Sequence, residues 1–389
     1  MAIVVARTDS SRSARRPSLA GTGAALLLAL ALLQSGEATP QGATGALRQN
    51  GEATPQVATG SPPPRLQDTG LYADFETLRV DPAHLAFAPQ YPLWSDGATK
   101  RRWISLPPGT AIDASDPEAW VFPIGTRLWK EFSFNGQRVE TRYLERRADG
   151  QWLYAAYAWS PDGREAQLVS ERGKRNAYPL GAGRSHTIPG VSDCKVCHQG
   201  GRTEVLGFSA LQLSSDRDHG ALHAEARPDP GVDLRFLVDR GLLVGLPQVL
   251  LDAPPRIAAA SPEERTALGY MHGNCGHCHN DQGSLKNIGL FLRQPAGVAS
   301  QAAVASAVGQ SIKKPAPGMS EDAVLRIARG HPERSGLVQR IASRYPALQM
   351  PPLGTELIDE EAVSVLRRWI AQMDDRHAEA RWGEKGEPR

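Results

Sequence analysis

The sequence predicts an α+β fold, with an N-terminal antiparallel β domain followed by a mainly α-helical region. Between residues 94 and 169, short runs rich in β-branched and aromatic residues are separated by hairpin signals such as Asn135-Gly136 and Asp149-Gly150. The last third differs, because it holds a capping box at 261–264 and apolar residues at helical spacing over 362–373. The strand pattern favours a sandwich or a barrel for the β domain.

Residues 1–38 have the layout of an export signal. Four arginines between positions 7 and 16 precede the apolar run 19–33, which is short for a membrane span and is followed by a plausible cleavage site near 36–38. An uncleaved membrane anchor is the alternative. We therefore expect a periplasmic or secreted protein of a Gram-negative type bacterium, with no stable membrane span once the signal is cleaved.

Residues 39–69 are predicted to form a disordered linker. The hexapeptide Gly-Glu-Ala-Thr-Pro-Gln occurs at 36–41 and again at 51–56, and three prolines follow at 62–64. This composition, without apolar periodicity, buries too little surface to offset the chain entropy lost on folding. At the other end of the chain, residues 377–389 are predicted to be a polar tail.

The β domain is expected to span residues 70–185. Its predicted strands are 102–106, 127–134, 139–144 and 152–159. Six of the eight tryptophans lie here, either as an aromatic platform for a ligand or as the core of the sheet, and we favour the core because aromatic residues routinely fill sheet interiors. Segment 91–98 is a candidate for a special loop, since turn formers surround its polar groups.

All four cysteines of the chain lie in two copies of the pattern Cys-x-x-Cys-His. The copies consist of Cys194, Cys197 and His198 and of Cys275, Cys278 and His279. In this pattern two thiols add to the vinyl groups of a haem and the histidine binds its iron, so the sequence predicts two covalent haems c. A four-thiolate zinc site is the main alternative, but it does not require a histidine after each pair. A thioredoxin-like pair would occur once, and structural disulfides would be more widely spaced.

Residues 256–376 are predicted to form a helical domain around the second motif. Ser261-Pro262-Glu263-Glu264 caps a helix that runs to His272 and delivers Cys275 just beyond its end. Asp359-Glu360-Glu361 caps a closing amphipathic helix.

Met350 lies between these two helices and precedes Pro351-Pro352. It follows Cys275 by 75 residues (350 minus 275). With the motif-bearing helix and the closing helix, this arrangement resembles class I cytochrome c. The resemblance implies Met350 as the distal thioether ligand of the second haem, a role in which soft sulfur raises the reduction potential. A methionine that merely fills the core is the alternative.

Residues 186–255 carry the first motif but leave the sixth ligand of its iron open. No methionine lies between His198 and Met271, so this ligand is a histidine, another donor, a remote methionine or nothing. His272 is our first choice, because it lies on the helix that presents the second motif and could face a neighbouring haem. His223 and His186 follow in that order, and for each the alternative is a surface or packing histidine.

Several further motifs extend the similarity beyond the haem sites. They are 91–98 (YPLWSDGA), 122–126 (FPIGT), 139–142 (VETR), 186–189 (HTIP), 206–208 (LGF) and 270–274 (YMHGN). With the haem motifs, they make most of the mature chain resemble a family of exported dihaem c-type cytochromes of uncharacterised role. Bacterial dihaem peroxidases are less similar, because they lack a Trp-rich β domain, and the motifs here are 81 residues apart (275 minus 194).

Electron transfer through the two haems is the function that the sequence favours, with a redox protein as partner. The alternative is a dihaem redox enzyme, peroxidase- or oxygenase-like, in which the Met-ligated second haem feeds electrons to an open first haem. A weaker possibility is a β domain that binds an extracellular polymer. The 44 basic and 42 acidic residues leave a net charge of +2, which gives no bias toward nucleic acid or an anionic membrane.

Overall fold

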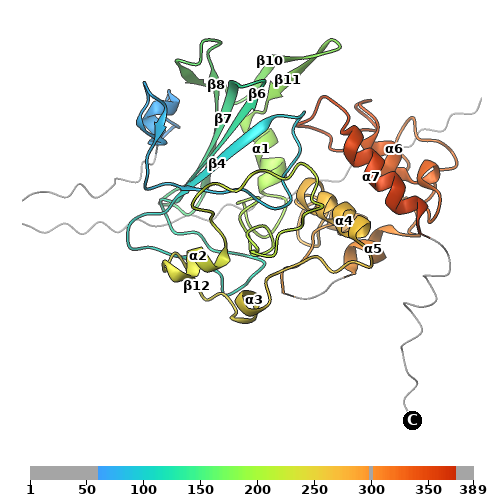
Figure 1. Ribbon diagram of the computed structural model, residues 1–389. Coiled ribbons are helices and arrows are strands. Elements are labelled where there is room, and N and C mark those ends of the chain that lie inside the picture. The colour runs from blue at the N-terminus through green and yellow to red at the C-terminus, as the bar shows by residue number, and fades with distance from the viewer. Residues whose placement is uncertain (1–59, 298–300, 374–389) are drawn as a thin grey trace, which may run out of the picture. The chain divides into compact units, whose positions relative to one another are not determined.

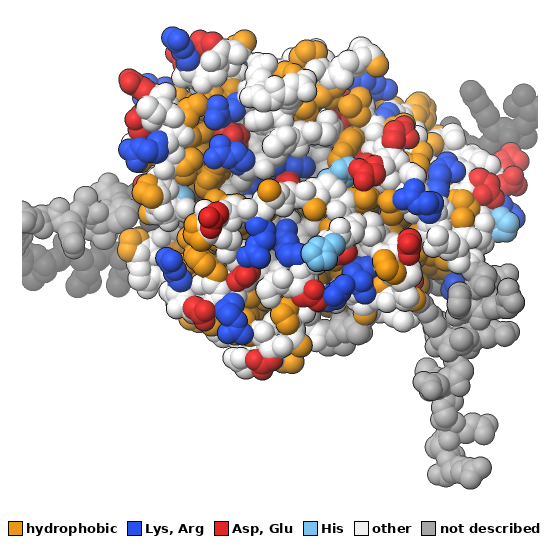
Figure 2. Space-filling model, in the orientation of Figure 1, with side chains coloured by type: hydrophobic (Ala, Val, Ile, Leu, Met, Phe, Trp, Pro, Cys, Tyr) orange, Lys and Arg blue, Asp and Glu red, His pale blue; other side chains and the backbone are white. Residues whose placement is uncertain are grey.

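The computed structural model describes residues 60–297 and 301–373, all of which belong to one compact unit, Pro55–Arg389 (Figure 1). The expected export signal, most of the linker and the polar tail lie outside the described residues. Antiparallel strands dominate the N-terminal half and helices the C-terminal part, which confirms the α+β class. On the face drawn in Figure 2, acidic and basic side chains are interspersed, as the small net charge of +2 leads one to expect.

A six-stranded antiparallel sheet forms the centre of the β domain. Its strands, in spatial order, are β3 (Leu85–Ala86), β4 (Thr99–Ser105), β6 (Arg127–Phe134), β7 (Gln137–Arg146), β8 (Trp152–Trp159) and β9 (Ala166–Leu168). All four predicted strands are confirmed within a few residues. The β6–β7 hairpin turns at Asn135-Gly136, where both residues have positive φ, 50° and 80°, as a type I′ turn requires.

The expectation of a sandwich or barrel is wrong, because the described residues form one open six-stranded sheet, accompanied only by three two-stranded pairs (β1 with β2, β5 with β12, β10 with β11). One face is covered by the segment with the 3₁₀ helix η1 (Leu66–Thr69) and the short strands β1 (Tyr72–Asp74) and β2 (Arg79–Val80). The other is covered largely by irregular chain from 205 to 251. Irregular covering segments take the place of a second sheet. Such segments have no strand periodicity, so the sequence could not distinguish this arrangement from a sandwich.

The covering segment 205–251 makes the sheet and the region that carries the first motif share a core. Ile104 and Leu128 of the sheet pack in one cluster with Phe208, Leu234 and Leu237. The segment contains α2 (Leu234–Asp239), β12 (Leu243–Val244) and α3 (Val249–Asp252), and β12 pairs in parallel with β5 (Ile112–Asp113). The expected boundary at 185/186 therefore does not separate two cores.

The tryptophans of the β domain are core residues, as favoured above. Trp103, Trp129 and Trp159 are at most 6 % exposed and pack beneath the N-terminal segment. The indole N–H groups of Trp129 and Trp159 donate to buried threonine hydroxyls at 2.9 and 3.0 Å. Burial with satisfied polar atoms is the arrangement expected of a core and not of an exposed platform.

The C-terminal part is built from short helices packed around α4 and α7. These elements are α4 (Pro262–Asn274), η2 (Lys286–Ile288), α5 (Ala302–Ala307), η3 (Pro332–Arg334), α6 (Gly336–Ile341) and α7 (Glu360–Ala371). Both predicted caps are confirmed: Ser261 Oγ accepts from Glu264 N at 3.1 Å, and Asp359 Oδ1 accepts from Ala362 N at 3.1 Å. Within the described ranges, no helix is long and apolar enough to cross a bilayer.

The loop 91–98 docks onto α4. The Tyr91 ring lies where a Cβ at Gly269 would be, only 2.2 Å away, so this close approach requires glycine. Trp94 N–H donates to the Asn274 side-chain oxygen at 2.7 Å, next to the second motif. The special role expected for this loop is thus a structural one, since it joins the sheet to the helix that leads into Cys275.

Candidate functional site

The first motif occupies α1 (Val191–His198), which directly follows the hairpin β10 (Lys174–Gly181) and β11 (Arg184–Ile188). Asp193 caps the start of the helix, because its carboxylate accepts from Gly190 N–H at 3.0 Å. Cys194 and Cys197 are three residues apart in this helix and so lie on one side of it, as attachment to a single planar group requires.

The second motif begins where α4 ends. Cys275 is the C-terminal cap of α4, and its N–H donates to Met271 O at 2.9 Å. The chain then makes a tight turn in which His279 N–H donates to Cys275 O at 2.8 Å. The capping box at one end of α4 and the motif at the other fix the position of these side chains relative to the helix.

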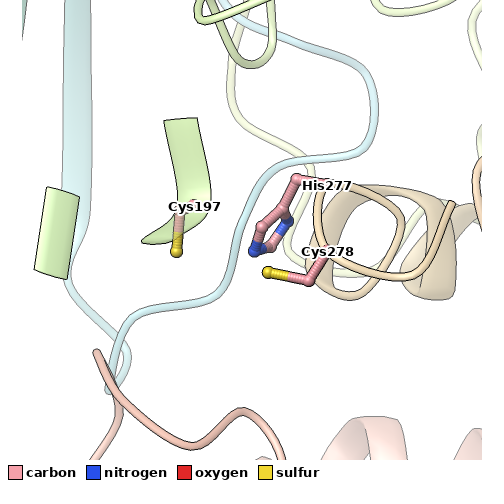
Figure 3. Close-up of side chains that lie close together, drawn as sticks. All are labelled: Cys197, His277 and Cys278. Atoms are coloured by element: carbon pink, nitrogen blue, oxygen red, sulfur yellow. The ribbon is translucent and has the colours of Figure 1, made fainter. Parts of the chain in front are cut away.

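The two motifs lie against each other, although they are 81 residues apart in the sequence. The ligating atoms of Cys197, His277 and Cys278 are all within 4.8 Å of one another. Figure 3 shows His277 and Cys278, beyond the end of α4, pointing toward Cys197 on α1. Cys278 Sγ also lies 3.8 Å from Val196 O.

Asn280 joins the backbones of the two motifs. Its buried side-chain amide donates to Gly200 O, two residues beyond the first motif, at 2.7 Å, and to Gly276 O and His277 O of the second motif at 3.1 and 3.0 Å. Its carbonyl oxygen accepts from Gln282 N and Gly283 N, both at 2.9 Å. A Cβ at Gly200 would lie 2.4 Å from His277 O, so the two backbones meet where side chains do not fit.

All four cysteines are free thiols, and their surroundings keep most of them protonated. A hydrogen bond with the Cys278 thiol, together with burial, raises the pKa of Cys197 to about 12, whereas the same bond lowers the pKa of Cys278. Burial alone raises the pKa of Cys275 to about 12 and is the main influence that raises that of Cys194.

His198 is held in a state suited to binding a metal. Its Nδ1 lies 2.5 Å from Glu204 O, which accepts a hydrogen bond only if Nδ1 carries the proton. The lone pair of the neutral ring is then on Nε2. Burial, despite that hydrogen bond, lowers the pKa of His198 to about 4, so the ring is neutral at physiological pH.

His279 and Met350 lie in the same part of the C-terminal region. Burial, followed by the charge of His277 and those of Arg340 and Arg326, lowers the pKa of His279 to about 4. Met350 packs on the apolar core that also includes Cys275, and its N–H donates to Arg340 O at 2.9 Å. Met350 and Cys275 therefore pack against the same C-terminal core.

The three histidines considered for the first haem have other partners. His186 lies between the carboxylates of Asp96 and Glu140, with each ring nitrogen 3.7 Å from one of them, and His223 Nε2 is 2.8 Å from Asp359 Oδ2. His272 Nδ1 accepts from Gln294 N–H at 2.9 Å. A neutral ring with Nδ1 as acceptor carries its proton on Nε2, so this hydrogen bond counts against His272 as an Nε2 ligand.

His277 and Asn280 are site residues that sequence reasoning missed. His277 occupies a spacer position of the second motif, and such positions carry no ligand in the pattern itself. Asn280 directly follows His279 in a short polar run, where an asparagine normally indicates a turn. Their roles depend on the contact between α1 and the end of α4, which is a tertiary feature.

Comparisons with protein-family models, curated proteins and solved structures found no match to this chain.

Proposed function

We propose that this protein is an exported dihaem c-type cytochrome that transfers electrons to or from a redox partner protein. The observation that carries the proposal is the contact between the two Cys-x-x-Cys-His motifs, with Cys197, His277 and Cys278 in one group. Two attachment sites in contact suit an electron relay, which needs two redox centres close together. Export, to the periplasm or beyond the cell, rests on residues 1–38, and a c-type cytochrome is expected to receive its haems after export.

The residues of both motifs fit a covalent haem. Cys194 and Cys197 would hold the first haem with His198 as axial ligand, and Cys275 and Cys278 the second with His279 and Met350. The Glu204 carbonyl fixes the His198 tautomer that leaves Nε2 available, and burial keeps both histidines neutral. When bound, each haem supplies a one-electron iron couple whose potential depends on its axial ligands and on burial.

The helical region is proposed to be class I cytochrome c-like. Three features support this: α4 leads directly into the second motif, α7 packs against α4, and Met350 shares their apolar core. A thioether ligand near such a core raises the potential of its haem above that of a bis-histidine haem.

Mass spectrometry of the denatured holoprotein tests the proposal. We expect the mass of the chain plus two haems, and the Cys275→Ala/Cys278→Ala variant should retain one. Iron analysis should give two atoms per chain. Zinc in place of haem would overturn the proposal, because Cys197, His277 and Cys278 would then be ligands of a structural zinc ion.

Substituting Met350 tests the second haem separately. Met350→Ala should abolish the sulfur-to-iron charge-transfer band of the oxidised protein and lower one of the two reduction potentials. Met373→Ala is the matched control, since Met373 packs on the same core. If the band and both potentials persist in Met350→Ala, another residue is the distal ligand.

A redox enzyme with an open first haem is the second candidate. This candidate is favoured because each histidine first considered as a sixth ligand contacts another protein group. These histidines are His186, His223 and His272. Rapid carbon monoxide binding by one haem of the ferrous protein, with turnover of peroxide, would establish it. Absence of binding would instead favour a protein ligand, and His277→Ala should then convert one haem to a high-spin state if His277 is that ligand.

A further inference from the structure

Three cations are direct neighbours on the sheet face that carries α1. Arg102 on β4 pairs with Lys130 on β6, and Lys130 pairs with Arg142 on β7, so the three form one row across three strands. Tyr154 on β8 shares this face, and its ring centroid lies 5.4 Å from that of His198. The row therefore lies on the side of the sheet that faces the first motif.

Like charges directly opposite in a sheet repel, so the row requires anions. Arg102 is paired with Glu225, and the Arg142 guanidinium donates to Glu140 at 2.7 Å. Lys100 lies next to the row on the same face, and its ammonium nitrogen is 3.8 Å from a carboxylate oxygen of the same Glu225. Four cations thus share two carboxylates.

Lys130 is the member of the row that lacks an anion. Among the described residues, no carboxylate lies within ion-pair distance of its ammonium group, which sits 4.7 Å above the Phe132 ring. Burial, and then the charges of Arg102, Lys100 and Arg142, lower the pKa of Lys130 well below its usual value. An anion at this position would remove that penalty.

Tyr154 adds an unused hydrogen-bond donor beside the row. Its side chain is 3 % exposed, and among the described residues its buried hydroxyl has the Gln199 side chain nearby but no partner in good hydrogen-bond geometry. The side chain opposite Arg142 on β8 is only that of Ala156, so the row ends at a small residue beside Tyr154. Orphaned buried hydroxyls are uncommon in folded proteins and call for a ligand or an ordered water.

We propose that Lys130, flanked by Arg102 and Arg142 and assisted by Tyr154, forms an anion site that binds a carboxylate or small oxyanion beside the first motif. The source expected, which rests on the proposed function, is a propionate of the haem held at Cys194 and Cys197. Propionates are the anionic groups of a haem, and His198 lies against this same sheet face. The other source is an oxyanion from solution.

Reduction potentials of the holoprotein test the first source. Lys130→Met removes one positive charge but keeps the length of the side chain, and it should lower the potential of one haem only, because a nearby cation favours the ferrous state. The potential of that haem should fall as the propionate loses its proton. In Lys130→Met this fall should occur at a higher pH, because the propionate no longer has that cation beside it. Lys174→Met, an exposed cation on β10, is the matched control and should change neither property.

Thermal melting tests the second source and does not depend on haem. At constant ionic strength, inorganic phosphate should raise the melting temperature of the wild type and not that of Lys130→Met if the site takes an oxyanion from solution. Tyr154→Phe, which removes only a hydroxyl, should shift whichever property Lys130→Met shifts, to a smaller extent. If neither variant changes a potential or a phosphate response relative to Lys174→Met, the proposal is wrong, whether or not the protein binds two haems.

Discussion

Asn280 is the single residue on which the contact between the two motifs depends most. Its buried amide is hydrogen-bonded to the backbone at both motifs. If the amide is removed, the backbone carbonyl groups that it bonded cannot easily bind water instead. A buried polar group without a partner costs about 1–3 kcal/mol, and we expect Asn280→Ala to lower the free energy of unfolding by about 3 kcal/mol. Denaturant titration measures this, with the exposed Asn287→Ala as control. Equal stabilities of the two variants would contradict the bridging role.

His186 gives the stability of the protein a defined pH dependence. Burial disfavours its charged form, but the carboxylates of Asp96 and Glu140 outweigh burial and raise its pKa to about 9, against an ordinary value of about 6.5. The resulting stabilisation is complete below about pH 6.5 and is lost as the pH rises through about 9. From the difference in pKa, it amounts to about 3 kcal/mol.

The difference in unfolding free energy between wild type and His186→Gln isolates this contribution. It should be largest at pH 6 and should shrink toward pH 9.5. Taking the difference matters, because burial lowers the pKa of Lys100 to about 8, and that group makes the fold more stable as the pH rises above 8. A difference that is constant between pH 6 and 9.5 would show that the pKa of His186 is the same in the folded and unfolded states, and would contradict this contribution.

At the scale of elements, the end of α1 meets the turn after α4 at Gly200. A Cβ there would lie 2.4 Å from His277 O, whereas at Gly201 the nearest atoms are 3.8 and 4.0 Å away. Gly200→Ala should therefore destabilise the protein by about 1–3 kcal/mol through overpacking, and Gly201→Ala should have little effect. In the holoprotein, Gly200→Ala should also change the separation of the two reduction potentials. Matching stabilities for the pair would mean that α1 and α4 are not in the contact described.

Individual elements could be predicted from the sequence to the extent that their signals are local. The N-caps at Ser261 and Asp359, the apolar face of α7 and the turn Asn135-Gly136 each act within a few residues, and each of these predictions is confirmed. Lys130 shows where local reasoning fails. Arg102 and Arg142 become its neighbours only through strand pairing, which no local pattern around Lys130 indicates.

The residues of the candidate site likewise divide into those that a local sequence pattern predicts and those whose role depends on tertiary contacts. The attachment residues follow from a five-residue pattern, and Met350 was singled out by its place before Pro351-Pro352; both Met350 and Cys275 pack against the C-terminal core. His272 was chosen because of its helix, but its hydrogen bond with Gln294 depends on how the chain after the motif returns to α4. His277 and Asn280 matter only because α1 packs beside them, and no spacing in the sequence encodes that contact.

At the scale of the whole molecule, the shared core predicts that the sheet and the segment 205–251, which follows the first motif, unfold together. Phe208, which is 1 % exposed, contacts the rings of Phe87, Trp120 and Phe122 at centroid distances of 4.8, 6.0 and 6.1 Å. These partners belong to the β domain, so residues 70–185 leave an apolar face uncovered when the segment 205–251 is absent.

Phe208→Ala should therefore lower the free energy of unfolding by about 3–5 kcal/mol, as deletion of a buried aromatic ring does. Because one core is affected, tryptophan fluorescence, which reports the sheet, and the absorbance of the proposed haems should change at the same lowered melting temperature. Val249→Ala is the control, since Val249 is 61 % exposed on the same covering segment and should melt like the wild type. Two separate transitions in Phe208→Ala, with the fluorescence transition unchanged, would mean that the β domain is stable without its covering segment.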